Sequence, residues 1–194
     1  METIKIDFVD FYPNFVKNNN ELYNALAEKF NLQICSSPDY IIYSCYGNEH
    51  LKYDCIKIFF TGENLVPDFN FCDYAIGFHF IDFEDRYLRL PLAVIRDTYK
   101  KTKDKKYDKE KVLRRKFCNF VYSNQGNAHP IRDKFYKELS RYKKIDAGGV
   151  AFNNIGGRVA DKISFIADYK FTIAIENSSV NGYVTEKIVE PMSV

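Results

Sequence analysis

The sequence predicts an α/β fold made of two Rossmann-like domains, each with an open parallel sheet, the second of them incomplete. Short strand patterns alternate with helical periodicities in both halves of the 194-residue chain, which favours parallel sheets with crossover helices. Turns rich in glycine and polar residues follow several strands, as in open sheets that bind ligands at strand ends. A change in composition at residues 100–116 separates the halves. We therefore predict a first domain at 1–99, a basic linker at 100–116 and a second domain at 117–194.

The first half opens with a strand and a helix. Residues 3–8 alternate apolar and polar side chains like a half-buried strand, and Leu22, Leu26 and Phe30 then recur at helical spacing. Short β-branched and aromatic runs follow, separated by proline, glycine and polar residues, and they predict further strands of one sheet. These strands are expected at residues 32–35, 40–43, 56–60 and 73–78.

The second half repeats the strand-helix order. A strand is predicted at 116–123, followed by a helix from Pro130 to about Tyr142 with Ile131, Phe135 and Leu139 on its apolar face. A last helix is predicted to start near Tyr183, close to the end of the chain at Val194. Between these helices the sequence predicts a glycine-rich loop at 148–157, a helix at 161–168 and a strand at 171–175.

Net charge gives no general case for a nucleic-acid partner, because 28 Lys and Arg nearly balance 26 Asp and Glu. Residues 100–116 are an exception, with ten basic and three acidic side chains. Such a run is typical of a solvated linker or an exposed helix. It also fits contact with an anionic membrane surface or an acidic acceptor, and the sequence leaves both interpretations open.

The N-terminus has neither the basic start nor the apolar run of a secretory signal, and no stretch reaches the roughly 18 apolar residues of a spanning helix. We therefore expect a soluble, cytoplasmic protein.

The five cysteines are odd in number and form no CxxC pair. A disulfide framework or zinc site is not predicted, and the thiols are expected to be reduced and mostly buried.

The first candidate catalytic residue is Glu63. It follows the apolar strand at 56–60, in the turn Thr-Gly-Glu-Asn. A carboxylate presented beyond a strand end is suited to act as a general base. The same turn chemistry is common without any catalytic role, where the carboxylate caps a backbone amide.

A candidate anion site follows the strand at 116–123. Ser123 and Asn124 lie at its end, and Arg132 lies in the first turn of the next helix. A helix start offers N–H donors, and an arginine adds bidentate donors for phosphate oxygens, so Arg132 is a natural pyrophosphate ligand. The alternative is an exposed arginine without a ligand.

A third candidate site follows the strand at 171–175. Asn177 lies in the sequence Glu-Asn-Ser directly after it, and Tyr183, Glu186 and Lys187 are expected on one side of the last helix. A ring for stacking, a carboxylate for sugar hydroxyls and an ammonium group for phosphate suit a nucleotide sugar. By spacing alone they equally fit a helix cap with an ordinary surface pair.

The segment FTIAIENSSVNGYVTEKIVEPM resembles the signature of the α-1,3/4-fucosyltransferase family, glycosyltransferase family 10. FFTGENLVPDFNFCDYAIGF, DRYLRLPL, KFCNFVYSN and PIRDKFYKEL resemble further family segments and occur in the family's order. The similarity covers the chain from about residue 56 to its end, in a C-terminally truncated form. It is greatest for the bacterial branch, because animal members carry an N-terminal membrane anchor that we do not find in this sequence.

The resemblance implies a GT-B architecture, with an acceptor-binding domain at 1–99 and an incomplete GDP-fucose-binding domain at 117–194. It implies transfer of L-fucose with inversion to an N-acetylglucosamine-type residue of a surface glycan, in α-1,3 or α-1,4 linkage. Glu63 matches the family's general base. The residues expected around GDP-fucose are Arg132, Tyr183, Glu186, Lys187, Asn177, Ser123 and Asn124.

No metal or other cofactor is expected, because Arg132, Lys187 and a helix start can stabilise the charge that builds on GDP. The expected partners are GDP-fucose and an oligosaccharide or lipid-linked glycan, in protein glycosylation or lipopolysaccharide synthesis, with peripheral contact to the inner membrane. A glycoside hydrolase would also use carboxylates but would not need these cations. The other alternative is an inactive fragment that binds a glycan or nucleotide sugar, since we expect the 194-residue form alone to bind GDP-fucose weakly and to turn it over little or not at all.

Overall fold

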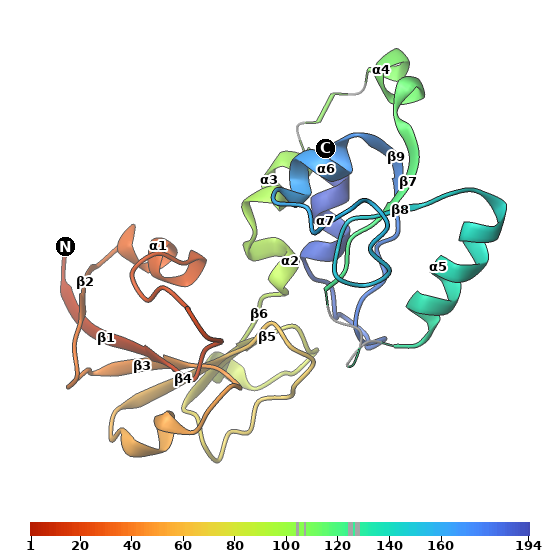
Figure 1. Ribbon diagram of the computed structural model, residues 1–194. Helices are drawn as coiled ribbons and strands as arrows, with labels where there is room; N and C mark the ends of the chain where they lie inside the picture. Colours follow the sequence, from red (N-terminus) through yellow and green to blue (C-terminus); the bar gives the residue numbers. More distant parts are fainter. Residues whose placement is uncertain (104, 107, 124–125, 127–128) are drawn as a thin grey trace. The chain divides into compact units, whose positions relative to one another are not determined.

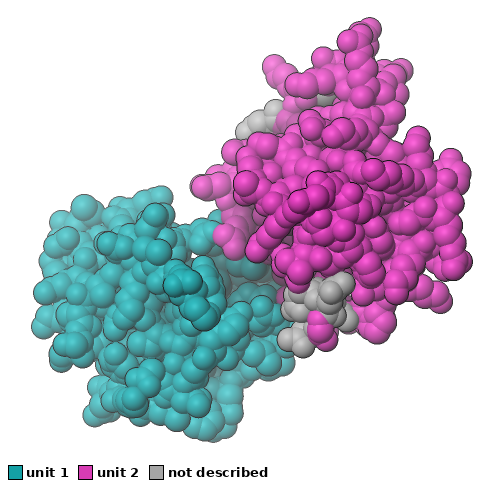
Figure 2. All heavy atoms as spheres, viewed as in Figure 1, with its two compact units in different colours: residues 1–95 teal, residues 96–194 magenta. Residues whose placement is uncertain are grey.

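The computed structural model describes residues 1–103, 105–106, 108–123, 126 and 129–194. The chain divides into two compact units, Met1–Ile95 and Arg96–Val194, which Figure 2 colours teal and magenta. Each unit has its own parallel sheet and its own buried core, so the predicted α/β class is confirmed in both halves.

The first unit is organised around a six-stranded parallel sheet with the order β2-β1-β3-β4-β5-β6 (Figure 1). All the strands predicted for this half are present. The additional strand β6 is only three residues long, too short for a periodic pattern to reveal it. The strands are β1 (Thr3–Val9), β2 (Asn31–Ile34), β3 (Tyr40–Tyr43), β4 (Ile56–Phe60), β5 (Tyr74–Gly77) and β6 (Tyr87–Arg89).

Apolar side chains cover both faces of this sheet. Ile41 and Ile42 are neighbours in β3 and point to opposite faces, and their exposed fractions are 0% and 2%. Ile42 packs with Phe8 on one face, whereas Ile41 packs with Phe59 on the other. Burial on both sides explains the nearly continuous apolar runs in these strands.

Helix α1 (Glu21–Ala27) packs Leu22 and Leu26 against the Phe8 face of the sheet. Its first turn is capped by the side chain of Asn20. The predicted helical spacing extended to Phe30, but the helix ends at Ala27. The other helices of the first unit are α2 (Leu92–Ile95) and the 3₁₀ turns η1 (Glu49–Lys52) and η2 (Glu84–Arg86).

The second unit contains a three-stranded parallel sheet with the order β8-β7-β9. Helix α5 follows β7 as predicted, but its buried face is offset from the predicted one. Arg132 and Tyr136 are buried, whereas Ile131 and Phe135 are exposed, because Tyr136 stacks on Phe152 of the glycine-rich segment at 4.7 Å. The elements are α3 (Asp97–Lys103), α4 (Lys109–Arg114), β7 (Lys116–Phe120), α5 (Ile131–Tyr142), β8 (Asp146–Ala147), α6 (Lys162–Ala167), β9 (Tyr169–Thr172) and α7 (Glu186–Met192).

Three element boundaries in the second unit correct the sequence prediction. Strand β7 ends at Phe120, three residues before the predicted end at 123. Strand β9 pairs with β7 only as far as Thr172, so the strand predicted at 171–175 begins two residues and ends three residues too late. The last helix begins at Glu186 rather than near Tyr183. Gly182 has a φ of +85°, which ordinary residues rarely adopt, and Thr185 caps the helix, so the intervening residues form a loop.

The basic segment at 100–116 is partly helical. It contains the end of α3 and the whole of α4, and both helices belong to the second unit by their contacts. Helix α3 packs against α7, and α6 also contacts α7 (Figure 1). None of the helices in the described part of the chain has the length and apolarity needed to cross a membrane.

The five cysteines form no disulfide among the described residues, as expected. Cys72 and Cys118 are buried, and burial raises the pKa of the Cys118 thiol to about 11. The other three are only partly buried, so the expectation that most would be buried was wrong. They are Cys35, Cys45 and Cys55.

Candidate functional site

Five donor-side candidates of the second unit gather beyond the carboxyl ends of β7 and β9, where open parallel sheets bind ligands. They are Arg132, Asn177, Tyr183, Glu186 and Lys187. Tyr122 joins the two strand ends. Its hydroxyl lies 2.9 and 3.1 Å from the carbonyl oxygens of Ile173 and Ile175, which share its one proton, and it accepts a hydrogen bond from the Ile175 N–H at 2.7 Å. Burial raises the pKa of Tyr122 to about 12, so this hydroxyl keeps its proton near neutral pH. These bonds fix the backbone that leads into Glu176.

The glycine-rich loop crosses the same strand end. The Ala151 N–H donates to the Tyr122 carbonyl at 2.9 Å. A Cβ atom at Gly149 would collide with the Tyr122 backbone, so only glycine allows this close approach. The loop therefore packs directly against the backbone that follows β7.

Arg132 is fully buried, which excludes the alternative of an exposed arginine. Its guanidinium carbon lies 4.3 Å from the centroid of the Tyr122 ring, and Nη1 donates to Oδ1 of Asn177 at 3.3 Å. A backbone hydrogen bond of 3.0 Å from His129 N to Asn177 O joins the same two segments. Arg132 and Asn177 are thus brought together, and they hold the start of α5 against the loop that follows β9.

Glu176 binds the start of α7. Its Oε1 accepts a hydrogen bond from the Thr185 N–H at 2.8 Å, and its Oε2 accepts one from the Thr185 hydroxyl at 2.7 Å. Thr185 is 2% exposed and is itself the N-cap of the helix. This arrangement places the next two residues, Glu186 and Lys187, directly beside the end of β9.

Lys187 lies between two carboxylates. Its Nζ is 3.6 Å from Oε2 of Glu176 and 3.2 Å from Oε1 of Glu186, and its side chain is 15% exposed. Burial alone would raise the pKa of Glu186, but Lys187, the backbone N–H of Glu186 itself and Lys162 outweigh it and hold the pKa below its ordinary value. Both carboxylates therefore face a cation, and an anionic ligand has to compete with them for Lys187.

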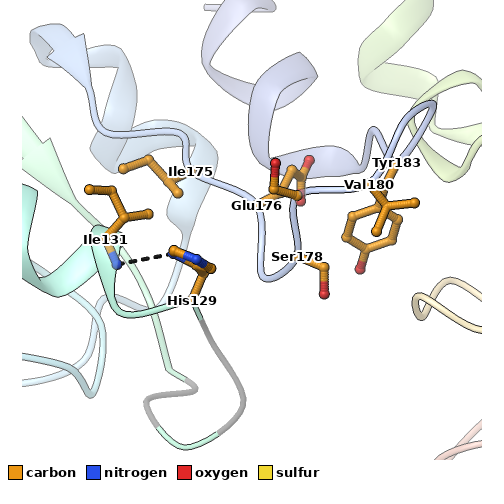
Figure 3. Close-up of a pocket in the computed structure, with 8 residues that line it drawn as sticks. His129, Ile131, Ile175, Glu176, Ser178, Val180 and Tyr183 are labelled. Atoms are coloured by element: carbon orange, nitrogen blue, oxygen red, sulfur yellow. Dashed lines mark hydrogen bonds between the residues drawn. The ribbon is translucent and has the colours of Figure 1, made fainter.

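A pocket of about 430 Å³ adjoins these residues. Figure 3 shows Ser178, Val180 and Tyr183 along one side of it and His129 and Ile131 along the other. Tyr183 is buried, with an exposed fraction of 7%, and it belongs to the loop before α7. The prediction that Tyr183 shares a helix side with Glu186 and Lys187 was therefore wrong, although its side chain does line the pocket. The pocket is lined by His129, Ile131, Ile175, Glu176, Ser178, Ser179, Val180 and Tyr183.

The remaining donor-side candidates are Ser123 and Asn124. Ser123 is exposed three residues after the end of β7. Asn124 lies outside the described residues. Contact of either side chain with a ligand stays a prediction.

The candidate base, Glu63, lies in the first unit, in the turn after β4. Its side chain is exposed, its Oε1 accepts a hydrogen bond from the Tyr46 hydroxyl at 3.0 Å, and its N–H donates to Thr61 Oγ1 at 3.1 Å. In these bonds the Glu63 carboxylate is bound to a side chain, Tyr46, and not to a backbone amide of its own turn, as the capping alternative would require. That Glu63 faces Arg132 and Lys187 across a cleft stays a prediction.

Among the described residues, no group of three or more His, Cys, Asp or Glu side chains is arranged to hold a metal ion. The cations Arg132 and Lys187 fit an anionic ligand instead. That the chemistry needs no metal stays a prediction.

Sequence reasoning missed three residues that organise the site: Tyr122, Glu176 and Thr185. Thr185 carried a usable signal, since a threonine followed by an acidic residue often caps a helix. Tyr122 and Glu176 carried no such signal. Tyr122 bonds Ile173, more than 50 positions away, and Glu176 bonds Thr185, nine positions away. Their roles depend on which strands are neighbours.

Two family models match the chain almost end to end. Residues 6–96 match the N-terminal domain of alpha-(1,3)-fucosyltransferase FucT, and residues 110–194 match the C-terminal part of glycosyltransferase family 10 (fucosyltransferase). The chain is also 34% identical to alpha-(1,3)-fucosyltransferase FucT of Helicobacter pylori, over 89% of this chain and 44% of that protein. It thus spans less than half the length of this relative.

Solved structures agree with the family models. A crystal structure of an α1,3-fucosyltransferase is similar with a TM-score of 0.83 and 31% identity, over 99% of this chain and 67% of that one. A crystal structure of an α1,3-fucosyltransferase with GDP-fucose is similar with a TM-score of 0.78 and 30% identity, over 98% of this chain and 66% of that one. These similarities confirm the predicted GT-B type of fold, and the chain belongs to glycosyltransferase family 10, the fucosyltransferases.

Proposed function

We propose that this protein transfers L-fucose from GDP-fucose to an N-acetylglucosamine-type residue of a surface glycan, in α-1,3 or α-1,4 linkage and with inversion. The observation that carries the proposal is the placement of Lys187 and Arg132 around the strand ends beside the pocket, in a chain of this family. A similar structure contains GDP-fucose, which supports the same donor here.

On the donor side, Lys187 is the cation best placed for the diphosphate. Its side chain keeps 15% exposure, and Glu176 and Thr185 fix its position before the ligand arrives. A preorganised cation stabilises the charge that builds on GDP as the glycosidic bond breaks, without reorganisation during the reaction. Glu186 and Asn177 are proposed to bind the fucose hydroxyls, and Tyr183 to pack against the donor in the pocket.

Arg132 supplies the second positive charge. Because its side chain is fully buried, direct contact with a phosphate oxygen requires the Asn177 amide to move off the guanidinium. Without such a movement Arg132 still acts at short range, since charges interact strongly where water is excluded. These two cations make an obligatory metal unnecessary in the proposed mechanism.

On the acceptor side, Glu63 is proposed to take the proton from the attacking hydroxyl. Inversion needs a base on the sugar face opposite the leaving group, and a carboxylate can serve as that base.

We propose that the enzyme acts in the cytoplasm, with the basic segment at 100–116 in peripheral contact with the inner membrane, where a lipid-linked acceptor would be available.

The test is a transfer assay with labelled GDP-fucose and an N-acetylglucosamine-containing oligosaccharide. We expect little transfer of label by the unmodified 194-residue chain. Glu63→Ala should lower that rate about 10²-fold or more, as removal of a general base does, and Lys187→Ala should weaken donor use. Lys109→Ala, an exposed lysine on α4, is the matched control and should transfer normally. Near-normal transfer by Glu63→Ala would remove it as the base.

The same assay separates the alternatives. Release of free fucose without transfer would indicate a hydrolase. Binding of GDP-fucose in calorimetry, with no turnover of either kind, would instead support a nucleotide-sugar-binding fragment. That outcome would be consistent with a chain that spans only 44% of its Helicobacter pylori relative.

A further inference from the structure

In the first unit, a half-exposed aromatic surface adjoins Glu63. Tyr46 and Tyr12 are 51% and 54% exposed, and their rings meet edge to face at 6.4 Å. The Tyr46 hydroxyl donates to Oε1 of Glu63 at 3.0 Å. We propose that Tyr12, Tyr46 and Glu63 form the acceptor-sugar site, in which the rings bind the apolar face of a pyranose and Tyr46 positions the carboxylate. The inference rests on the proposed function and assigns its acceptor residues.

Tyr46 is held in place by a buried anchor. Its N–H donates to the Asp10 carbonyl at 2.9 Å. The Asp10 carboxylate, whose side chain is 1% exposed, accepts hydrogen bonds from the backbone N–H groups of Glu49 and His50 at 2.8 and 2.9 Å and contacts His50 Nδ1 at 2.7 Å. Asp10 adopts a φ of +59°, a strained value for a residue other than glycine. Buried bonds that keep a residue in such a conformation are typical of functional positions.

Tyr12 is supported in a similar way. Its ring meets Phe15 edge to face at 5.6 Å, Phe15 stacks on Phe11 at 3.9 Å, and Phe15 also contacts the buried core residue Phe8 at 5.8 Å. The exposed ring is therefore the outer end of a packed aromatic series. A rigid ring that remains half exposed offers contact area at low entropic cost, which suits stacking against a sugar.

The location of this surface fits an acceptor. Tyr12 follows β1, Tyr46 follows β3 and Glu63 follows β4, and these three strands are parallel neighbours in the sheet. Their carboxyl ends thus converge at one edge, which is where such sheets bind ligands. A pyranose has an apolar C–H face for the rings and hydroxyl groups for the carboxylate.

The hydrogen bond from Tyr46 has a specific consequence for catalysis. It occupies Oε1 of Glu63, while the Glu63 N–H bonds Thr61 Oγ1 and fixes the backbone of the turn. The acceptor hydroxyl then approaches Oε2, and its proton moves to that oxygen as the hydroxyl oxygen attacks the anomeric carbon and GDP leaves. Tyr46 touches the base rather than the reacting atoms, so it is a positioning residue.

Two substitutions separate positioning from stacking. Tyr46→Phe keeps the ring and removes the hydroxyl, so we expect kcat to fall about tenfold with the acceptor KM unchanged. Tyr12→Ala removes a stacking ring, so we expect the acceptor KM to rise about tenfold with kcat retained. The donor KM should not change in either variant. Tyr142→Ala removes a ring that is 80% exposed in the second unit and serves as the control.

The outcomes also separate this proposal from the proposed function. If the unmodified chain transfers fucose, an unchanged kcat in Tyr46→Phe or an unchanged acceptor KM in Tyr12→Ala overturns the site. If the unmodified chain transfers none, the proposed function fails, and saturation-transfer NMR with N-acetyllactosamine tests the sugar site alone. Loss of the sugar signal in Tyr12→Ala but not in Tyr142→Ala supports the site, and equal signals overturn it.

Discussion

The two candidate sites of this protein are built in opposite ways. In the second unit, Arg132 and Thr185 are 0% and 2% exposed, and each is bound by polar groups from other segments. In the first unit, Glu63 is exposed and is held by one side-chain hydrogen bond from Tyr46, which is 51% exposed. A diphosphate site needs cations whose positions are fixed in advance, whereas a surface carboxylate leaves room for a large acceptor.

This difference predicts how stability and function are linked at each site. Substitutions in the buried network should destabilise the second unit and weaken donor binding together. Substitutions around Glu63 should affect activity with little change in the free energy of unfolding.

Arg132→Ala should have the largest effect. It removes a fully buried side chain that stacks on Tyr122 and bonds Asn177, and the cavity and the unsatisfied Asn177 oxygen left behind together cost about 3 kcal/mol. Arg141 lies on the same helix with a 76% exposed side chain, so Arg141→Ala should change stability by less than about 0.5 kcal/mol. Urea denaturation followed by circular dichroism measures both. Equal losses in the two variants would contradict the buried network.

Thr185→Val should cost about 2 kcal/mol, because it keeps the shape of the side chain but leaves the partly buried Glu176 carboxylate without the hydroxyl. The control is Thr185→Ser, which retains the hydroxyl and should recover most of the loss. The same denaturation experiment applies. If serine were no better than valine, the hydroxyl of Thr185 would not be the group that matters.

Glu186→Gln should reduce the sensitivity of the second unit to acid. The pKa of Glu186 is lowered in the folded state, so its carboxylate contributes stability above about pH 4.5, and that contribution is lost as the pH falls through the lowered value. The unmodified chain should therefore lose more stability than Glu186→Gln below pH 4.5. Thermal melting at a series of pH values tests this, and parallel curves would show that Glu186 is not stabilised by Lys187.

Glu63→Gln should change the free energy of unfolding least, by less than about 0.5 kcal/mol, because the side chain is exposed. Its transfer activity should nevertheless fall sharply, since an amide cannot accept the proton. Melting temperature and transfer rate, measured on one preparation, give the comparison. A large loss of stability would mean that the turn around Glu63 has a structural role instead.

Much of the fold was predictable from local patterns. The strand at 3–8 was predicted because apolar and polar residues alternate, and the strand at 56–60 because β-branched and aromatic residues form a short run between turn signals. The start of α7 was misplaced, because apolar and charged spacing alone does not show the positive φ at Gly182. The buried face of α5 was missed since Arg132, a charged residue, occupies a core position that only tertiary partners explain.

The candidate site was predictable in part. Arg132, Tyr183 and Lys187 were found from their types and positions after strands, together with the resemblance to a family. Glu176 and Tyr46 were not, because each acts through a partner that is separate in sequence and becomes adjacent only on folding.

The most direct test of the account is calorimetric titration of the protein with GDP-fucose, comparing Lys187→Met with the exposed control Lys109→Met. Lys187 is held by Glu176 and Thr185, and we infer that it binds the donor diphosphate. Loss of a hydrogen bond to a charged group should weaken binding by about tenfold or more in Lys187→Met, with no change in the control. Equal dissociation constants for the two variants would contradict the central claim.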